Sequence, residues 1–141
     1  MTHSHSVTAA MAMLPQWEQA VWRDQVADMT RSYCMFPDKA GGKTPEVLNE
    51  VRPYLYYGEK GWLLHYFPAE SEAANRERAS RGFVWVAQHV ISDLKAGELD
   101  RAARYAGGLT HTLGDASCPI HSLEGPFDLR GVINLVHAPP P

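Results

Sequence analysis

A chain of 141 residues with 45% hydrophobic side chains has the size and composition of one globular domain. Its formal net charge at pH 7 is -3, so no basic surface attracts phosphate backbones, and we expect no binding to double-stranded nucleic acid. No apolar run approaches the roughly 20 residues that span a bilayer, and the first residues lack the basic start and apolar centre of a signal peptide. We therefore expect a soluble chain with neither a transmembrane segment nor an export signal.

Helix signals dominate the first part of the chain. Ser6 is a candidate cap for a first helix that ends at Met13, and Pro15 separates this helix from the next one. Apolar side chains at three-and-four spacing predict an amphipathic helix over residues 17–33. These side chains are Trp17, Val21, Trp22, Val26 and Met29.

A loop and a short helix are predicted next. The composition of residues 37–45, "PDKAGGKTP", is typical of a loop. Thr44 and Pro45 are suited to cap and begin a short helix that runs to about Val51. We interpret residues 52–70 as an irregular connection that is rich in aromatic side chains.

Two long helices are predicted in the second half, over residues 71–95 and 99–116, with Gly97 just past the end of the first. The first is expected to bury one side, made of Phe83, Val84, Val86, Val90, Ile91 and Leu94. Gly107 and Gly108 each cost the second helix roughly 1 kcal/mol relative to alanine, so we expect a close approach by another helix or a site there. Residues 1–141 are therefore predicted to form an all-α, single-domain multi-helix bundle with long loops.

The stretch "HTLGDASCPIH", residues 111–121, gathers residues that bind metals. His111 and Asp115 are four residues apart near the end of the last helix, so they lie on one face. Pro119 would end the helix and turn the chain, so that His121 points back toward them. Imidazole nitrogens and carboxylate oxygens are zinc ligands, so the stretch indicates a zinc site. The alternative is a hydrogen-bonded core histidine, a helix-end carboxylate and a surface histidine.

The same stretch resembles the signature of the zinc-dependent phospholipase C and P1 nuclease-like superfamily. That signature is H, three residues, D, five residues, H, with G directly before D and P two residues before the last H. Three further stretches resemble the family less tightly: "SHSVTAAMAMLP" its first helix with a histidine ligand, "FPD" its aspartate loop, and "LLHYF" its middle histidine. The resemblance implies the helical fold of this superfamily and a centre of two or three zinc ions.

The resemblance assigns roles to residues around the first two ions. It implies that His65, His111 and Asp115 hold one zinc, and that Asp115 bridges to a second zinc. His5 and backbone groups at the start of the chain would hold that second ion, although His3 is an alternative to His5. In the family the first residue is usually a tryptophan exposed by signal cleavage, whereas this chain begins "MTHSH".

The remaining assignments concern catalysis and a third ion. Asp38 would lie beside the metal pair, where it binds metal directly or orients and deprotonates the attacking water. His121 would belong to a third zinc, with His137 further along. The family places a carboxylate four residues after that histidine, where this chain has Pro141. Either Glu124 substitutes for it, or the third site is incomplete and Glu124 is a solvated loop residue, or the chain is a piece of a longer protein.

The resemblance implies a metal-dependent phosphodiester hydrolase of phospholipase C type. Its partner would be a phospholipid headgroup or another phosphodiester, with transient contact with a membrane surface. A single-strand nuclease is the second choice, because the short chain and the spacing of His65 and His111 are closer to bacterial phospholipases. Tyr66 and Phe67 are assigned to substrate binding, within an aromatic cluster that lines a cleft or fills the core.

A second hypothesis comes from the departures from the family pattern. A non-catalytic zinc-binding relative, or a domain fragment, would keep the fold and use it for a structural or partner-binding role.

Secretion is implied by the resemblance although this chain shows no signal peptide, so the localisation stays open. Cys34 and Cys118 could pair, lie reduced in the core or approach a metal, and the buried free thiol is the first choice. His89 is expected to be a hydrogen-bonded core histidine.

Overall fold

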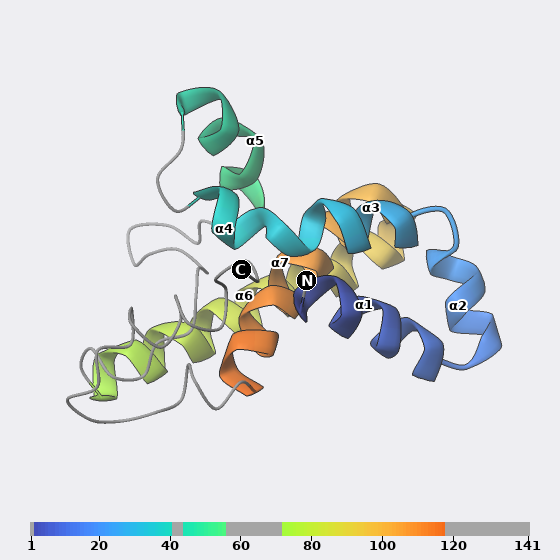
Figure 1. The fold of residues 1–141 in the computed structure, drawn as a ribbon, viewed down its shortest axis with the longest axis horizontal. Coiled ribbons are helices and arrows are strands. Elements are labelled where there is room, and N and C mark those ends of the chain that lie inside the picture. The colour runs from blue at the N-terminus through green and yellow to red at the C-terminus, as the bar shows by residue number, and fades with distance from the viewer. Residues whose placement is uncertain (1, 41–43, 56–71, 118–141) are drawn as a thin grey trace, which may run out of the picture.

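The part of the chain that the structure describes is built from helices. The computed structural model describes residues 2–40, 44–55 and 72–117, and within these ranges it has no β-strand. Figure 1 shows the helices in chain order. They are α1 (Thr2–Met13), α2 (Gln16–Trp22), α3 (Val26–Arg31), the 3-10 helix η1 (Tyr33–Met35), α4 (Phe36–Ala40), α5 (Pro45–Leu55), α6 (Glu72–Ala96) and α7 (Leu99–Ser117). The all-α prediction is confirmed for these residues.

Helix α7 lies at the centre of this arrangement. It packs along α6 on one side, and α1, η1, α4 and α5 contact its other sides (Figure 1). Its buried residues recur at helical spacing, which places them on a broad face toward the core. They are Ala102, Ala103, Tyr105, Gly107, Gly108, His111, Thr112 and Asp115. The main core unites side chains of six helices around this face: Val7, Met29, Tyr33, Cys34, Phe36, Val51, Leu55 and Ala103.

The two glycines of α7 mark close contacts, as the sequence predicts. A Cβ atom at Gly107 would meet Cβ of Tyr33 first, and it would lie 2.7 Å from the carbonyl carbon of Tyr33 and 3.1 Å from the amide nitrogen of Cys34. A Cβ atom at Gly108 would lie 2.9 Å from Cδ2 of Leu55. The neighbours of Gly107 are therefore the backbone of η1 and the Cβ atom attached to it, so η1 lies directly on α7.

A polar network also fastens η1 to α7. The hydroxyl of Tyr33 donates a hydrogen bond to Asp100 at 2.7 Å, and the guanidinium of Arg104 donates another to the same carboxylate at 2.8 Å. Burial, aided by the hydrogen bond to Asp100, raises the pKa of Tyr33 to about 12, so its hydroxyl stays a donor at neutral pH. This network holds the residue next to Cys34 in place.

Four predicted boundaries in the first half are wrong. Helix α1 begins at Thr2 rather than at Ser6, and the helix expected over 17–33 is divided into α2 and α3 by a turn at residues 23–25. Neither glycine nor proline stands at this turn, so its cause is tertiary: Met29 enters the core, whereas Trp17 is 69% exposed. The expected loop at 37–45 begins as helix α4, because a proline is tolerated in the first turn of a helix. Helix α5 passes through Pro53 and ends at Leu55.

Helix α6 ends as predicted but buries fewer residues than expected. Gly97 has a φ of 77°. Its N–H donates a hydrogen bond to the carbonyl of Leu94 at 3.2 Å, and the N–H of Glu98 donates one to the carbonyl of Asp93 at 2.9 Å. This pair of bonds is a Schellman motif. Of the six apolar residues expected on the buried side, Val84 and Ile91 are exposed. The reason is that α7 covers only one stripe of α6, which contains Val86.

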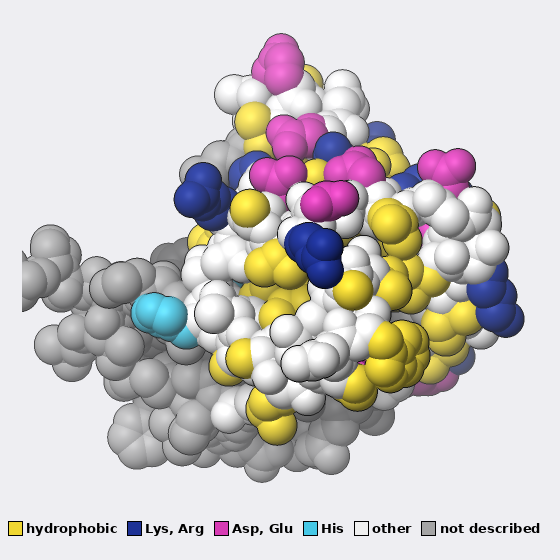
Figure 2. Space-filling model, turned by 90° about the vertical axis from the view of Figure 1, so that its right-hand side faces the viewer, with side chains coloured by type: hydrophobic (Ala, Val, Ile, Leu, Met, Phe, Trp, Pro, Cys, Tyr) yellow, Lys and Arg dark blue, Asp and Glu magenta, His cyan; other side chains and the backbone are white. Residues whose placement is uncertain are grey.

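The surface of the described residues is mixed in character. Figure 2 shows apolar side chains spread over the end of the molecule formed by α1 and α2, while acidic side chains gather toward α5. No helix in the described ranges combines the length and apolar character needed to cross a membrane.

Gly107→Ala is expected to lower the free energy of unfolding by about 1–3 kcal/mol, the usual cost of overpacking a core. Gly108→Ala is the matched control, because the end of the Leu55 side chain can move aside and both variants gain helix propensity. Urea unfolding followed by circular dichroism measures both changes. Equal stabilities of the two variants would contradict the backbone contact at Gly107.

Candidate metal centre

Three side chains that bear metal ligands converge between α1 and α7. His3 comes from the first turn of α1, and His111 and Asp115 come from α7. One ligand atom of each lies within 4.8 Å of the others. Nε2 of His3 is 3.5 Å from Oδ1 of Asp115, and Nε2 of His111 is 3.6 Å from Oδ2. We refer to these residues as the His3–His111–Asp115 cluster.

His111 is held in one orientation by the backbone of η1. Its side chain is fully buried, and Nδ1 lies 2.7 Å from the carbonyl oxygen of Cys34. Since a carbonyl only accepts hydrogen bonds, Nδ1 carries the proton and Nε2 of the neutral ring presents its lone pair to the cluster. Burial lowers the pKa of His111 against the opposing attraction of Asp115. The neutral ring is the form that binds a metal ion.

Asp38 lies at the outer edge of the cluster. It is on α4, and its Oδ1 atom is 3.9 Å from Nε2 of His111. Its side chain is 41% exposed, whereas that of Asp115 is buried. The two carboxylates thus approach the same imidazole nitrogen, one from the core and one from the solvent side. The structure thus brings Asp38 of α4 next to His111 and Asp115 of α7, from which it is distant in the sequence.

At the start of the chain, His3 rather than His5 joins the cluster. The rings of His3 and His111 stack with centroids 3.7 Å apart and an angle of 16° between planes. His5 is exposed. Two residues along a helix correspond to a rotation of about 200°, so His3 and His5 point to opposite sides of α1. Of the two histidines that the sequence offers, His3 therefore has the geometry of a ligand.

Several predicted site residues lie outside the described residues. They are His65, Tyr66, Phe67, His121, Glu124 and His137. Cys118, the second predicted free thiol, also lies outside these residues. Cys34 is a buried free thiol, as expected. His89 is half-buried, with Nδ1 2.8 Å from the carbonyl of Trp85, as expected for a hydrogen-bonded core histidine.

The donor atoms of the cluster fit zinc. Two imidazole nitrogens and a carboxylate oxygen are ligands that zinc accepts, at about 2.0–2.2 Å each. Two such ligands around a tetrahedral ion are roughly 3.3 Å apart. The separations of 3.5 and 3.6 Å between histidine nitrogens and Asp115 oxygens are close to this value. Asp115 turns a different oxygen to each histidine, Oδ1 to His3 and Oδ2 to His111.

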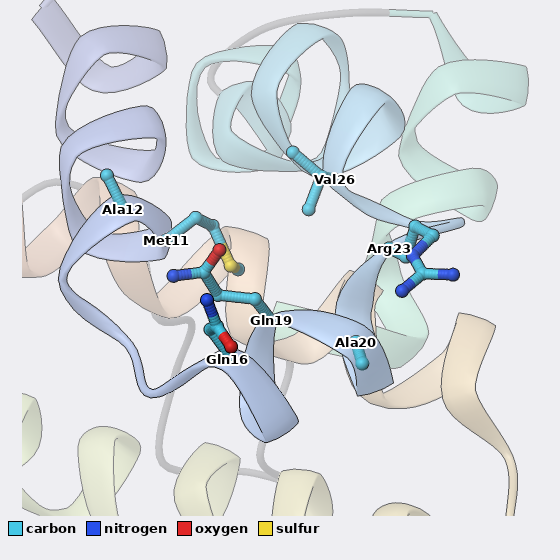
Figure 3. Close-up of a pocket in the computed structure, with 7 residues that line it drawn as sticks. All are labelled: Met11, Ala12, Gln16, Gln19, Ala20, Arg23 and Val26. Carbon is cyan, nitrogen blue, oxygen red and sulfur yellow. The ribbon is translucent and has the colours of Figure 1, made fainter.

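The open cavity in Figure 3 is separate from this cluster. Its volume is about 610 Å³, and it lies between α1, α2 and the start of α3. Its lining residues are Met11, Ala12, Gln16, Gln19, Ala20, Arg23 and Val26. They include no carboxylate, histidine or thiol, so this cavity offers none of zinc's usual ligands.

Comparison of the chain with protein-family models, with curated proteins and with solved structures gives no match.

The stability of the metal-free protein is expected to fall as the pH drops below about 6.5, the reference pKa of histidine. Because the pKa of His111 is lowered in the folded state, the unfolded chain binds the extra proton first. The loss continues down to the folded pKa, with a slope of at most about 1.4 kcal/mol per pH unit for one proton. Urea unfolding with a chelator at pH 7.5 and 5.5 measures it.

His111→Gln should make this pH-dependent loss smaller, because it removes the imidazole whose pKa is lowered by burial. An identical loss in wild type and His111→Gln would show that His111 is not the group that titrates.

Proposed function

We propose that this chain is a zinc-dependent phosphodiester hydrolase of phospholipase C type, with its metal centre at the His3–His111–Asp115 cluster. The single observation that carries the proposal is that cluster, with its donor atoms within 4.8 Å and Asp38 beside it. The resemblance of residues 111–121 to the phospholipase C and P1 nuclease-like signature supports it. So does the helical fold of the described residues.

Bound zinc would neutralise the phosphate charge, lower the pKa of water toward about 7 and stabilise the leaving oxygen. The chain's own residues prepare the site for this chemistry. His111, oriented by the Cys34 carbonyl, offers Nε2 without a proton. Asp115 approaches Nε2 of both histidines, and by the resemblance it would help to hold both ions. His65, by the resemblance, would complete the first of them.

Asp38 is proposed as the general base. Its carboxylate is near the buried ligands yet partly exposed, so it could take a proton from the attacking water and release it to solvent. A carboxylate buried like Asp115 lacks this path, which favours the bridging role for Asp115 and the proton-transfer role for Asp38. The two aspartates thus have different roles because their surroundings differ.

The proposed substrate is a phospholipid headgroup ester, with single-strand nucleic acid as the second choice. Tyr66 and Phe67 remain predicted substrate-binding residues, and His121, Glu124 and His137 remain predicted ligands of a third zinc. Transient contact with a lipid surface is compatible with the exposed Met13 and Trp17 at the junction of α1 and α2, since tryptophan favours membrane interfaces.

A second candidate is a non-catalytic zinc protein. It is favoured by the burial of His111 and Asp115 in α7, because an ion held there would stabilise the fold whether or not it meets a substrate. Zinc content and hydrolysis, measured together, separate the two candidates. Two or three zinc ions with chelator-sensitive hydrolysis support the enzyme, and bound zinc without hydrolysis supports the structural role.

Asp38→Asn should retain zinc while the rate of hydrolysis of p-nitrophenyl phosphorylcholine falls by about 100-fold or more, since the variant keeps the shape of the side chain and loses its basicity. Lys39→Gln, at the next residue of α4, is the control and should keep wild-type activity. Parallel assays with single-stranded DNA decide the substrate class. Full activity of Asp38→Asn would remove Asp38 from catalysis, and loss of zinc in this variant would make it a ligand.

His3→Ala and His5→Ala should separate the two candidate ligands at the start of the chain. His3→Ala is expected to lower the zinc content by about one ion per chain, because it removes a donor atom from the cluster. His5→Ala should keep the wild-type content, since this side chain is exposed. Elemental analysis after dialysis measures both. The opposite result would return the ligand role to His5.

A further inference from the structure

Gly114 lies where α7 faces the His3 imidazole. It directly precedes Asp115, and its backbone is helical. A Cβ atom at this position would lie 3.0 Å from Nδ1 of His3 and 3.5 Å from Cε1. The first distance is shorter than ordinary van der Waals contact, so either the imidazole or the helix would have to move.

The His3 imidazole has little room to move away without leaving the cluster. One face of the ring stacks on His111 at 3.7 Å, and Nε2 is 3.5 Å from Asp115. The next residue fixes the backbone, because Ser4 donates a hydrogen bond from Oγ to the Thr30 carbonyl at 2.8 Å. A side chain at Gly114 would therefore move Nε2 of His3 relative to the other ligand atoms.

The backbone gives no reason for a glycine at this position. Among the described glycines only Gly97 has a positive φ. Within a helix, alanine is more favourable than glycine. The helix itself would thus be more stable with alanine at position 114. What alanine would disturb is the position of the His3 imidazole.

We propose that Gly114 is a positioning residue. Because it has no side chain, the His3 imidazole can lie beside the other ligand atoms of the metal centre. Gly114 thereby controls the binding of the zinc ion that His3 would hold. This inference rests on the proposed zinc site. It adds that a residue with no ligand atom controls the occupancy of that site. Gly114→Ala should weaken the zinc affinity of the His3-dependent ion by about 10–100-fold, the range typical of residues that orient ligands.

The test compares Gly114→Ala with Leu113→Ala, which changes an exposed neighbour on the same helix. Zinc titration should show weaker binding only in Gly114→Ala. The metal-free Gly114→Ala protein should melt at the wild-type temperature or above it, a result that general damage to the fold would not give. In a His3→Ala background, Gly114→Ala should cause no further loss of zinc affinity, because the two residues act through one ligand.

Nuclear magnetic resonance of the histidine rings tests the stacking of His3 on His111 in the metal-free protein. In chelated wild type, the His3 ring protons should be shifted by the stacked His111 ring, and Gly114→Ala should abolish this shift. A preserved shift with wild-type zinc affinity would overturn the inference, as would an equal loss of affinity with and without His3. If wild type binds no zinc, the proposed function fails, and the ring shift alone still decides the role of Gly114.

Discussion

The contact of α7 with the backbone of η1 at Gly107 is the constraint on which the site depends. Because glycine has no side chain, the backbone of Tyr33 and Cys34 lies directly against α7. One turn further along the helix, His111 reaches the Cys34 carbonyl at 2.7 Å. A wider separation of these elements would break that hydrogen bond and release the imidazole. Helix packing and the orientation of a candidate ligand therefore have one common cause.

The core that results is unusually polar at one end of α7. His111, Thr112 and Asp115 are buried there, although burying polar groups costs free energy unless they are paired. Each has a partner: Thr112 bonds within its helix, His111 bonds the Cys34 carbonyl, and Asp115 approaches Nε2 of both His3 and His111. Buried polar side chains that converge at one place, at a cost to folding, are typical of functional sites. Gly114 is a further example, because glycine destabilises a helix relative to alanine and this one lies beside His3.

Several features of α6 and α7 could be predicted from the local sequence. Helices have a period of 3.6 residues, so His111 and Asp115 necessarily share a face once α7 forms. Glycine destabilises the interior of a helix, so its presence at position 107 predicts a close contact, and its place at the end of a helix predicts the positive φ of Gly97. What local patterns did not predict was which face becomes covered. Val84 and Ile91 match the helical spacing as well as Val86 does, yet only Val86 lies under α7.

The sequence by itself determined the all-α class, the two long helices α6 and α7, and the pairing of His111 with Asp115 on one face. The pairing depends only on residues within about one helical turn. Only the tertiary structure decided that His3, not His5, meets them, and that Asp38 lies on a helix at the edge of the cluster. The same holds for the turn between α2 and α3, where no glycine or proline marks the break. The physical reason is that α1, α4 and α7 are brought together by contacts between segments distant in the chain, and no local period encodes which of their faces meet.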